Sequence, residues 1–213
     1  MRLIILDFDG TMGDTRSLIV RTMQQTLQEL GLPACSDSQC ASTIGLPLKQ
    51  CFTTLLPLSD EEGERCAAVY TRLFFENNRP GAVPTFPHVI ETIEELHRRG
   101  YTLTIASSRG RDTLLEFVKA MKLDHIITYV LSANDTAQAK PHPEPVLKTL
   151  AHFGCPPEEA LVVGDMTFDI LMGRRAGAKT CGVTYGNGTQ QELEKAGADY
   201  IIDDFARLTR ICP

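Results

Sequence analysis

Short apolar runs alternate with amphipathic stretches over most of this chain. Each apolar run has the length of a β-strand rather than that of a helix. The predicted strands are residues 3–6, 103–106, 126–131, 161–163, 180–183 and 200–202. Because the intervening stretches are long enough for crossover connections, neighbouring strands are expected to run parallel.

The stretches between these strands carry helix signals. Apolar residues recur at helical spacing before Gly100, which is a typical helix stop. A second such pattern opens at Pro143 and ends at Gly154. Thr189 and Glu192 form a capping-box pattern at the start of a third helix. This alternation predicts an α/β fold, a doubly wound parallel sheet covered by helices on both faces.

Residues 15–81 break this rhythm. They contain long helical patterns, at residues 19–30 and 61–75, and no convincing strand. The stretch rich in proline and glycine at residues 79–84 is typical of a linker. We therefore predict a sheet-containing core, residues 1–14 and 82–213, with an all-helical subdomain, residues 15–81, inserted after the first strand.

The composition is that of a globular protein. Of 213 residues, 43% are apolar and 23% are charged, so a sizeable core can form. The net charge is −6 and no basic cluster exceeds a dipeptide, which argues against nucleic-acid binding. The apolar run at residues 3–6 is too short for a signal peptide, and no stretch has transmembrane length. The seven cysteines include no C-x-x-C pair, which argues against a disulfide framework or a zinc site and favours a soluble protein of the cytoplasm.

Two carboxylates directly follow the first predicted strand. Asp7 and Asp9 alternate in an extended chain, so both can face one point, and Gly10 lets the backbone turn away. Two close carboxylates favour a metal ion or a shared proton, which suits one nucleophile and one acid/base. The alternative is that these residues merely end a strand. An apolar strand that runs into D-x-D-G-T favours the catalytic interpretation.

A second acidic pair lies in the segment G-D-M-T-F-D at residues 164–169. If a helix begins near residue 167, Asp165 and Asp169 lie about one turn apart and can face the same sheet edge as Asp7. Taken alone, Asp165 could be an ordinary helix cap. Combined with the first pair, these oxygen ligands indicate a Mg²⁺ site.

Lys140 and two serines complete the set of candidate site residues. Prolines at positions 141 and 143 restrict the backbone around Lys140, and a rigid ammonium can neutralise a phosphate or a carboxylate. Ser107 and Ser108 follow a predicted strand and can donate to a phosphate oxygen. The alternatives are a solvated lysine and a serine turn or helix cap. No G-x-S-x-G elbow surrounds Ser107, so a serine nucleophile is disfavoured.

In this order, these pieces resemble the four motifs of the haloacid dehalogenase superfamily. The motifs correspond to residues 3–11, Ser107, Lys140 and residues 164–169. The resemblance spans the chain and implies a Rossmann-like core. The helical insertion is similar to the type-one cap of this superfamily, and the phosphoglycolate phosphatase-like and β-phosphoglucomutase-like members look most similar.

The resemblance implies a phosphoric monoester hydrolase with defined residue roles. Asp7 would attack phosphorus and form an aspartyl-phosphate. Asp9 would protonate the leaving oxygen and then activate the hydrolytic water. Mg²⁺ would bind Asp7, the backbone carbonyl of Asp9, and Asp165. Asp169 would support the metal or orient Lys140.

Further residues are expected to bind the small phosphorylated substrate. Ser107 and Lys140 would hold the transferring phosphoryl group, and Thr11 and Ser108 would lie beside it. Lys49 follows a Gly-Pro loop pattern in the inserted helices and could meet an anionic substrate tail. The alternative for Lys49 is a solvated lysine at a helix start.

The sequence is also compatible with three other functions. A sugar phosphomutase would use the same aspartate pair. A phospho-accepting signalling domain also combines acidic residues with a hydroxyl and a lysine, but it lacks a large helical insertion and the second acidic motif. An inactive scaffold would be unexpected with intact motifs. The substrate is open among phosphoglycolate, sugar phosphates, nucleoside monophosphates and pyrophosphate, and the protein is expected to be a monomer or homodimer that binds neither nucleic acid nor membrane.

Overall fold

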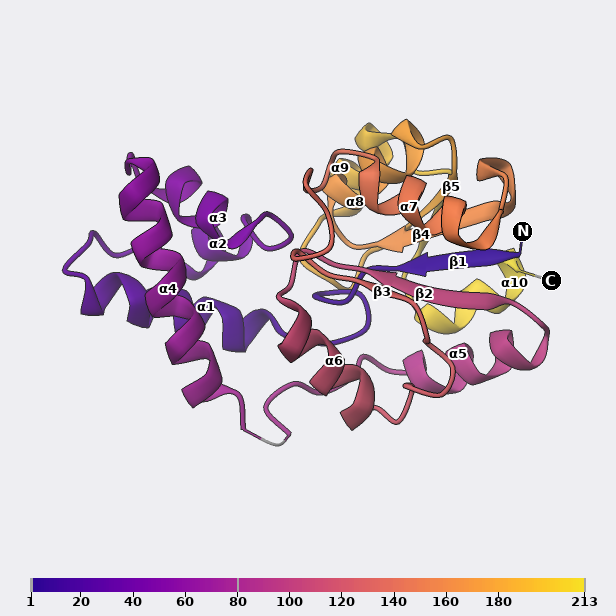
Figure 1. Cartoon of the computed structure of the whole chain (residues 1–213), viewed down its shortest axis with the longest axis horizontal. Helices are drawn as coiled ribbons and strands as arrows, with labels where there is room; N and C mark the ends of the chain where they lie inside the picture. The colour runs from indigo at the N-terminus through magenta and orange to yellow at the C-terminus, as the bar shows by residue number, and fades with distance from the viewer. Residues whose placement is uncertain (1, 80, 213) are drawn as a thin grey trace.

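The computed structural model describes residues 2–79 and 81–212. Its centre is a six-stranded parallel sheet in the order β3-β2-β1-β4-β5-β6 (Figure 1). The strands are β1 (Leu3–Leu6), β2 (Thr102–Ala106), β3 (Val130–Leu131), β4 (Ala160–Gly164), β5 (Lys179–Val183) and β6 (Tyr200–Ile202). The predicted α/β fold with a parallel sheet is confirmed.

Strand β1 lies inside the sheet, between β2 and β4. Leu6 is opposite Ile105 of β2 and Val163 of β4. Every residue of β1 and β4 is buried, as expected for parallel strands that are covered on both faces. The carboxyl ends of these three neighbouring strands therefore lie along one edge, where open α/β sheets bind their ligands.

Helices cover both faces of the sheet. Helices α5, α6 and α10 lie on one face and helices α7, α8 and α9 on the other (Figure 1). Alternate residues of β1 point to opposite faces: Ile4 and Leu6 belong to one apolar core, and Leu3 and Ile5 to the other. The bounds are α5 (Val89–Arg98), α6 (Arg111–Ala120), α7 (Glu144–Phe153), α8 (Thr167–Arg175), α9 (Gln190–Ala196), α10 (Leu208–Ile211) and the 3₁₀ segments η1 (Pro157–Glu159) and η2 (Phe205–Arg207).

The strand predicted at residues 126–131 is wrong over most of its length, because only Val130–Leu131 forms β3. The amides of Ile126 and Ile127 donate to the carbonyl of Leu123 and form a turn instead. Both isoleucines are buried in the larger core. The apolar run therefore indicates that these residues are buried, but not that they form a strand. A turn that packs on the core buries its side chains as well as a strand does.

The inserted segment forms a separate group of helices beyond the carboxyl edge of the sheet (Figure 1). We call it the cap; its helices are α1 (Arg16–Glu29), α2 (Asp37–Ala41), α3 (Leu48–Leu55) and α4 (Asp60–Asn77). Polar contacts join its two longest helices: Asn77 donates to Gln25 at 2.6 Å, and Arg72 pairs with Glu29 at 2.5 Å. The long helical patterns at residues 19–30 and 61–75 fall on α1 and α4.

None of the described helices is long and apolar enough to cross a lipid bilayer. All seven cysteines are free thiols, and six of them are buried. Burial raises the pKa of Cys51 to about 12 and that of Cys40 to about 11. These two thiols are therefore packing residues rather than nucleophiles.

Candidate active site

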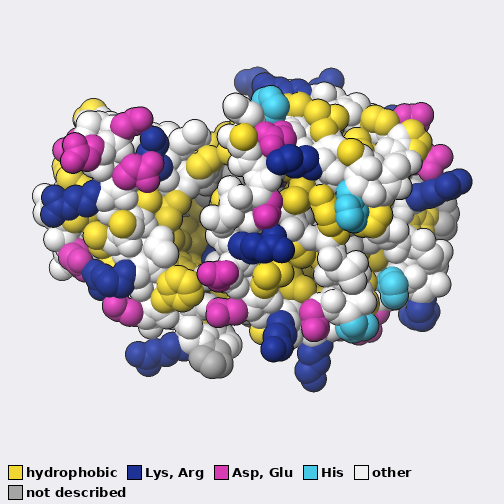
Figure 2. Space-filling model, viewed as in Figure 1, with side chains coloured by type: hydrophobic (Ala, Val, Ile, Leu, Met, Phe, Trp, Pro, Cys, Tyr) yellow, Lys and Arg dark blue, Asp and Glu magenta, His cyan; other side chains and the backbone are white. Residues whose placement is uncertain are grey.

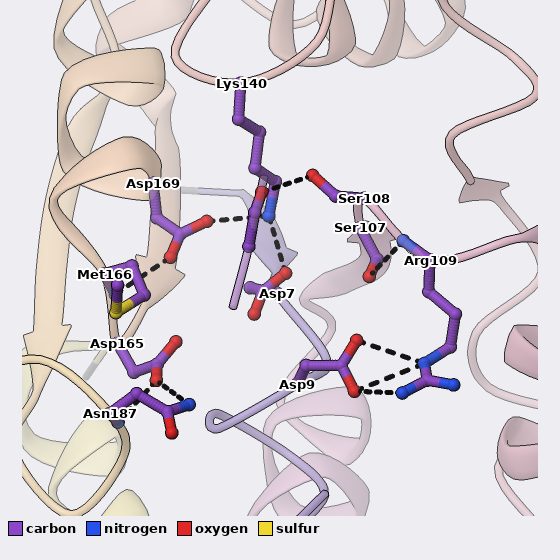
Figure 3. A network of polar contacts seen from close by, with 11 residues as sticks. Asp7, Asp9, Ser107, Ser108, Arg109, Lys140, Asp165, Met166, Asp169 and Asn187 are labelled. Atoms are coloured by element: carbon purple, nitrogen blue, oxygen red, sulfur yellow. Dashed lines mark hydrogen bonds and ion pairs between the residues drawn. The ribbon is translucent and has the colours of Figure 1, made fainter. Parts of the chain in front are cut away.

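Three predicted carboxylates meet at the carboxyl edge of the sheet. Asp7 follows β1, Asp165 follows β4 and Asp169 lies in the first turn of α8. One carboxylate oxygen of each lies within 4.8 Å of those of the other two, and all three residues are buried (Figure 3). The strand register explains this convergence, since β1 and β4 are direct neighbours. Asp7 donates its amide to the carbonyl of Val163 at 2.8 Å, which holds the two strand ends together.

Lys140 lies between two of these carboxylates. Its Nζ donates to Oδ1 of Asp7 at 2.5 Å and to Oδ1 of Asp169 at 2.6 Å. The residue is 4% exposed. Burial opposes the charged ammonium, but the two carboxylates outweigh it and raise the pKa of Lys140. Lys140 is therefore a fixed buried cation rather than a solvated surface lysine.

The acidic cluster fits a divalent cation. Burial, followed by the neighbouring Asp169, raises the pKa of Asp165 to about 7, because nothing nearby fully balances its charge. Oδ1 of Asp165 is buried without a hydrogen-bond partner. An orphaned buried carboxylate oxygen is costly, and a bound cation would satisfy it. Oxygen-only ligands at this spacing suit Mg²⁺.

Asn187 holds Asp165 in place, and we did not predict this role from the sequence. Its backbone amide and its side-chain amide donate to Oδ2 of Asp165 at 2.7 and 2.9 Å (Figure 3). The approach of these segments requires glycine. A Cβ on Gly10, which has φ +86°, would lie 2.1 Å from Oδ2 of Asp165, and one on Gly186 would lie 2.4 Å from the Asp165 Cβ. The G-N-G sequence after β5 was the available signal.

Asp9 lies apart from the acidic cluster and pairs with Arg109, a residue that sequence reasoning missed. Nε of Arg109 donates to both carboxylate oxygens of Asp9, at 3.2 and 3.0 Å, and Nη2 donates to one of them at 2.5 Å. The guanidinium carbon lies 4.7 Å from the ring centroid of Phe74 in the cap and 5.1 Å from that of Phe117 in α6. The proposed metal contact of the Asp9 backbone carbonyl stays a prediction.

The predicted hydroxyl groups differ in their surroundings. Ser107 Oγ accepts a hydrogen bond from the Arg109 amide at 3.3 Å and lies at the sheet edge. Ser108 Oγ donates to the carbonyl of Gly45 at 2.6 Å, so Ser108 joins the core to the cap. Thr11 is fully buried and its Oγ1 has no hydrogen-bond partner. Of these three residues, only the serines line the cavity between the core and the cap.

A cavity of about 400 Å³ lies between the core and the cap, and Asp7, Asp9, Ser107, Ser108 and Arg109 form its core side. This size is typical of small-molecule sites. A second cavity of about 310 Å³ is also lined by the two serines, together with Lys140.

The structure does not bring Lys49 to the cavity. Its ammonium lies 3.1 Å from Asp60 and 3.6 Å from Glu64, both on α4, and Lys49 is not a lining residue. The alternative interpretation, a lysine at a helix start with its charge at the surface, describes its position.

Comparisons with known proteins identify the family of this chain. A family model described as haloacid dehalogenase-like hydrolase matches residues 4–183. The probable phosphatase IndB of Dickeya dadantii is 36% identical over 211 residues, which cover 97% of this chain and 91% of that protein. Pyrophosphatase PpaX of Anoxybacillus flavithermus is 32% identical over 208 residues, which cover 98% and 95%.

Solved structures with the same fold match nearly the whole chain. A haloacid dehalogenase-like hydrolase from Bacteroides fragilis has a TM-score of 0.91 at 28% identity, and the match covers 97% of this chain and 98% of that one. A predicted phosphoglycolate phosphatase from Haemophilus somnus 129pt has a TM-score of 0.90 at 25% identity, with 100% and 98% covered. The chain belongs to the haloacid dehalogenase-like hydrolase family, which confirms the resemblance read from its motifs.

Proposed function

We propose that this protein is a Mg²⁺-dependent phosphatase that hydrolyses a small phosphorylated metabolite through an aspartyl-phosphate on Asp7. The observation that carries the proposal is the position of the Asp7 carboxylate. It lines the cavity, its charge is paired with buried Lys140, and the acid/base candidate Asp9 lies on the same cavity wall. The similarity to proteins named as phosphatases supports phosphorus as the centre of attack.

The chemistry follows from the positions of these side chains. A carboxylate oxygen of Asp7 attacks phosphorus, and the bond from phosphorus to the leaving oxygen breaks. Asp9 gives its proton to that oxygen. A water molecule then attacks the aspartyl-phosphate, Asp9 takes the water's proton, and inorganic phosphate leaves with Asp7 restored. Lys140 and Ser107 hold the phosphoryl oxygens, because two anions must approach each other in each step.

Asp7, Asp165 and Asp169 would hold Mg²⁺, together with the backbone carbonyl of Asp9. When bound, the ion would neutralise charge between the carboxylates and the phosphoryl group. The orphaned Oδ1 of Asp165 supports this ligand set.

We also propose the boundaries and surroundings of the enzyme. The catalytic core comprises residues 1–14 and 82–213, and the cap comprises residues 15–81, in line with the run of helices from α1 to α4. A cytoplasmic location is supported by the seven free thiols. The substrate is a small phosphorylated molecule, and the protein works as a monomer or homodimer without nucleic acid or membrane.

The test is trapping of the intermediate. With p-nitrophenyl phosphate and Mg²⁺, rapid quenching and peptide mapping should place the phosphoryl group on Asp7. Asp7→Asn should lose all turnover, whereas the matched control Asp14→Asn, at an exposed position, should keep it. A phosphoryl group found on another residue, or full activity of Asp7→Asn, would overturn the proposal. Release of free phosphate, rather than its transfer to a sugar, separates a phosphatase from a phosphomutase.

A further inference from the structure

The cap side of the active-site cavity is apolar. Helix α1 contributes Ile19 and Met23, and the segment from α2 into α3 contributes Ile44, Leu46 and Leu48. Figure 2 shows hydrophobic side chains gathered in the hollow between the cap and the core. A mostly apolar wall with a few polar groups at one end is typical of sites for organic molecules.

Aromatic rings from α4 extend this apolar wall. Tyr70, Phe74 and Phe75 line the cavity. Phe75 is 49% exposed, although large apolar side chains are usually covered. An exposed phenyl ring on a cavity wall is apolar area that a bound molecule can cover.

The cations of the cavity already have carboxylate partners. Arg109 pairs with Asp9, and Arg111 pairs with Asp135 at 2.9 Å. Among the described residues that line the cavity, the cap contributes no lysine or arginine. An anionic group in the cap half would lose its hydration without meeting an unpaired cation, which is strongly unfavourable.

Arg109 also fixes the order of groups along the cavity. Its guanidinium contacts the Asp9 carboxylate on one side and the Phe74 ring of the cap on another. The leaving oxygen must lie at Asp9, because Asp9 protonates it. The organic part attached to that oxygen therefore extends past Arg109 toward the aromatic wall of α4.

On these observations we propose that the physiological substrate is the phosphate monoester of an apolar, ring-containing alcohol. This inference rests on the phosphatase function proposed above and names its substrate class. The cap half of the cavity receives the ring. The phosphoryl group lies at Asp7, Lys140 and Ser107, beside the cation that the acidic cluster would hold. Substrates with a second anion, such as pyrophosphate or phosphoglycolate, fit the cavity poorly.

The test compares three esters that differ in one substituent. Ethyl phosphate, benzyl phosphate and phosphoglycolate carry a methyl, a phenyl and a carboxylate on the same methylene, and their leaving alcohols have similar acidity. We expect kcat/KM for benzyl phosphate to exceed that for ethyl phosphate by about tenfold or more, because a hydrophobic pocket discriminates by that order. The kcat/KM values for phosphoglycolate and for pyrophosphate should be lower than that for ethyl phosphate.

Acetyl phosphate, which is small and activated, separates the two ways of failing. The protein could hydrolyse acetyl phosphate but not prefer benzyl phosphate over ethyl phosphate, or it could prefer phosphoglycolate or pyrophosphate. Either result overturns the proposed substrate class and leaves the phosphatase function standing. No hydrolysis of acetyl phosphate or of any ester overturns the proposed function, and the substrate class with it.

Two cap variants test whether the apolar cap side of the cavity causes the preference for benzyl phosphate. Phe75→Ala should lower the ratio of benzyl to ethyl phosphate turnover by about fivefold, because ring contacts are lost. Leu46→Lys should move the preference toward phosphoglycolate. The matched control Leu147→Ala, on α7 and 46% exposed, should leave the ratio unchanged, since Leu147 does not line the cavity. An unchanged ratio in Phe75→Ala and in Leu46→Lys would overturn the proposal.

Discussion

Arg109 binds Asp9 through two nitrogens, with distances of 2.5 to 3.2 Å, and its guanidinium also lies against Phe74 of the cap. The side chains of this ion pair are 7% and 12% exposed. The residue proposed as acid and base is therefore oriented by a neighbour that touches the cap. Arg109 therefore contacts both the cap, through Phe74, and the proposed acid/base, through Asp9.

We predict that removal of Arg109 destabilises the fold. Arg109→Met leaves the Asp9 carboxylate without its cation in a mostly buried site, so the free energy of unfolding should fall by about 3 kcal/mol. Asp9→Asn in the same background should recover part of that loss, because no uncompensated charge then remains. Urea unfolding of both single variants and the double variant measures this coupling. Additive losses would show that the pair contributes nothing, and Arg207→Ala, at an exposed pair, is the control.

Asp9→Asn should separate the two chemical steps. A p-nitrophenolate leaving group scarcely needs a proton, so the variant should release a burst of p-nitrophenol and then stall with phosphate on Asp7. Alkyl phosphates should give no burst, because their leaving oxygens need the proton. Stopped-flow absorbance together with rapid-quench mass analysis follows both products. Steady turnover of alkyl phosphates by this variant would remove Asp9 from the acid role.

Lys140→Ala should lose about a thousandfold in kcat/KM, because a buried ammonium at the proposed phosphoryl site is removed. The variant should still fold when Mg²⁺ is present, since the cation partly balances the remaining carboxylates. Lys148→Ala, an exposed lysine on α7, is the matched control and should keep full activity. Steady-state kinetics and circular dichroism measure the two effects. Near-normal turnover in Lys140→Ala would contradict the proposed clamp.

Asn187→Ala should weaken Mg²⁺ binding by about tenfold, because partners that orient a metal ligand have effects of this size. The variant keeps the backbone donor to Asp165 but loses the side-chain donor at 2.9 Å. The Mg²⁺ concentration for half-maximal activity is the measurement. Gln190→Ala, at an exposed position on α9, should not change it. An equal shift in both variants would indicate a general loss of structure instead.

Stabilisation by Mg²⁺ should increase with pH. The pKa of Asp165 is raised from its ordinary value of 3.8 to about 7, so between these values the metal-free folded protein holds a proton that the unfolded chain has released. The free energy of unfolding without metal therefore falls as pH rises through this window and levels off above it. Below about pH 7, Mg²⁺ must displace that proton, which weakens binding.

The measurement is the shift of the melting temperature caused by saturating Mg²⁺, which should be larger at about pH 8 than at about pH 6. In Asp165→Asn, Mg²⁺ should change the melting temperature little at either pH. Undiminished phosphatase activity in excess chelator, with no metal left in the protein, would contradict the metal site itself.

The sequence by itself predicted the order of strands and helices and three carboxylates, Asp7, Asp165 and Asp169, that the structure brings together, because these features are encoded over a few neighbouring residues. The sequence did not show that the Asp9 carboxylate lies apart from them. The apolar run that ends at Asp7 and the run that ends before Asp165 each predict a buried strand followed by a carboxylate. Parallel strands then require the two carboxylates to meet at one edge. The strand predicted at residues 126–131 is longer than the observed strand, Val130–Leu131. An apolar pattern over so few residues indicates burial but does not determine the backbone conformation.

Only the tertiary structure decided which distant side chains become partners. Asp9 and Arg109 are 100 residues apart, and Asp165 and Asn187 are 22 apart, so their pairing depends on strand register and on which loops pack together. The same holds for Lys49, whose charge is taken up by α4 instead of by the active site. A local sequence pattern indicates the chemistry of which a side chain is capable. The packing of the chain determines its interaction partners, because ion pairs and hydrogen bonds form only between atoms a few ångströms apart.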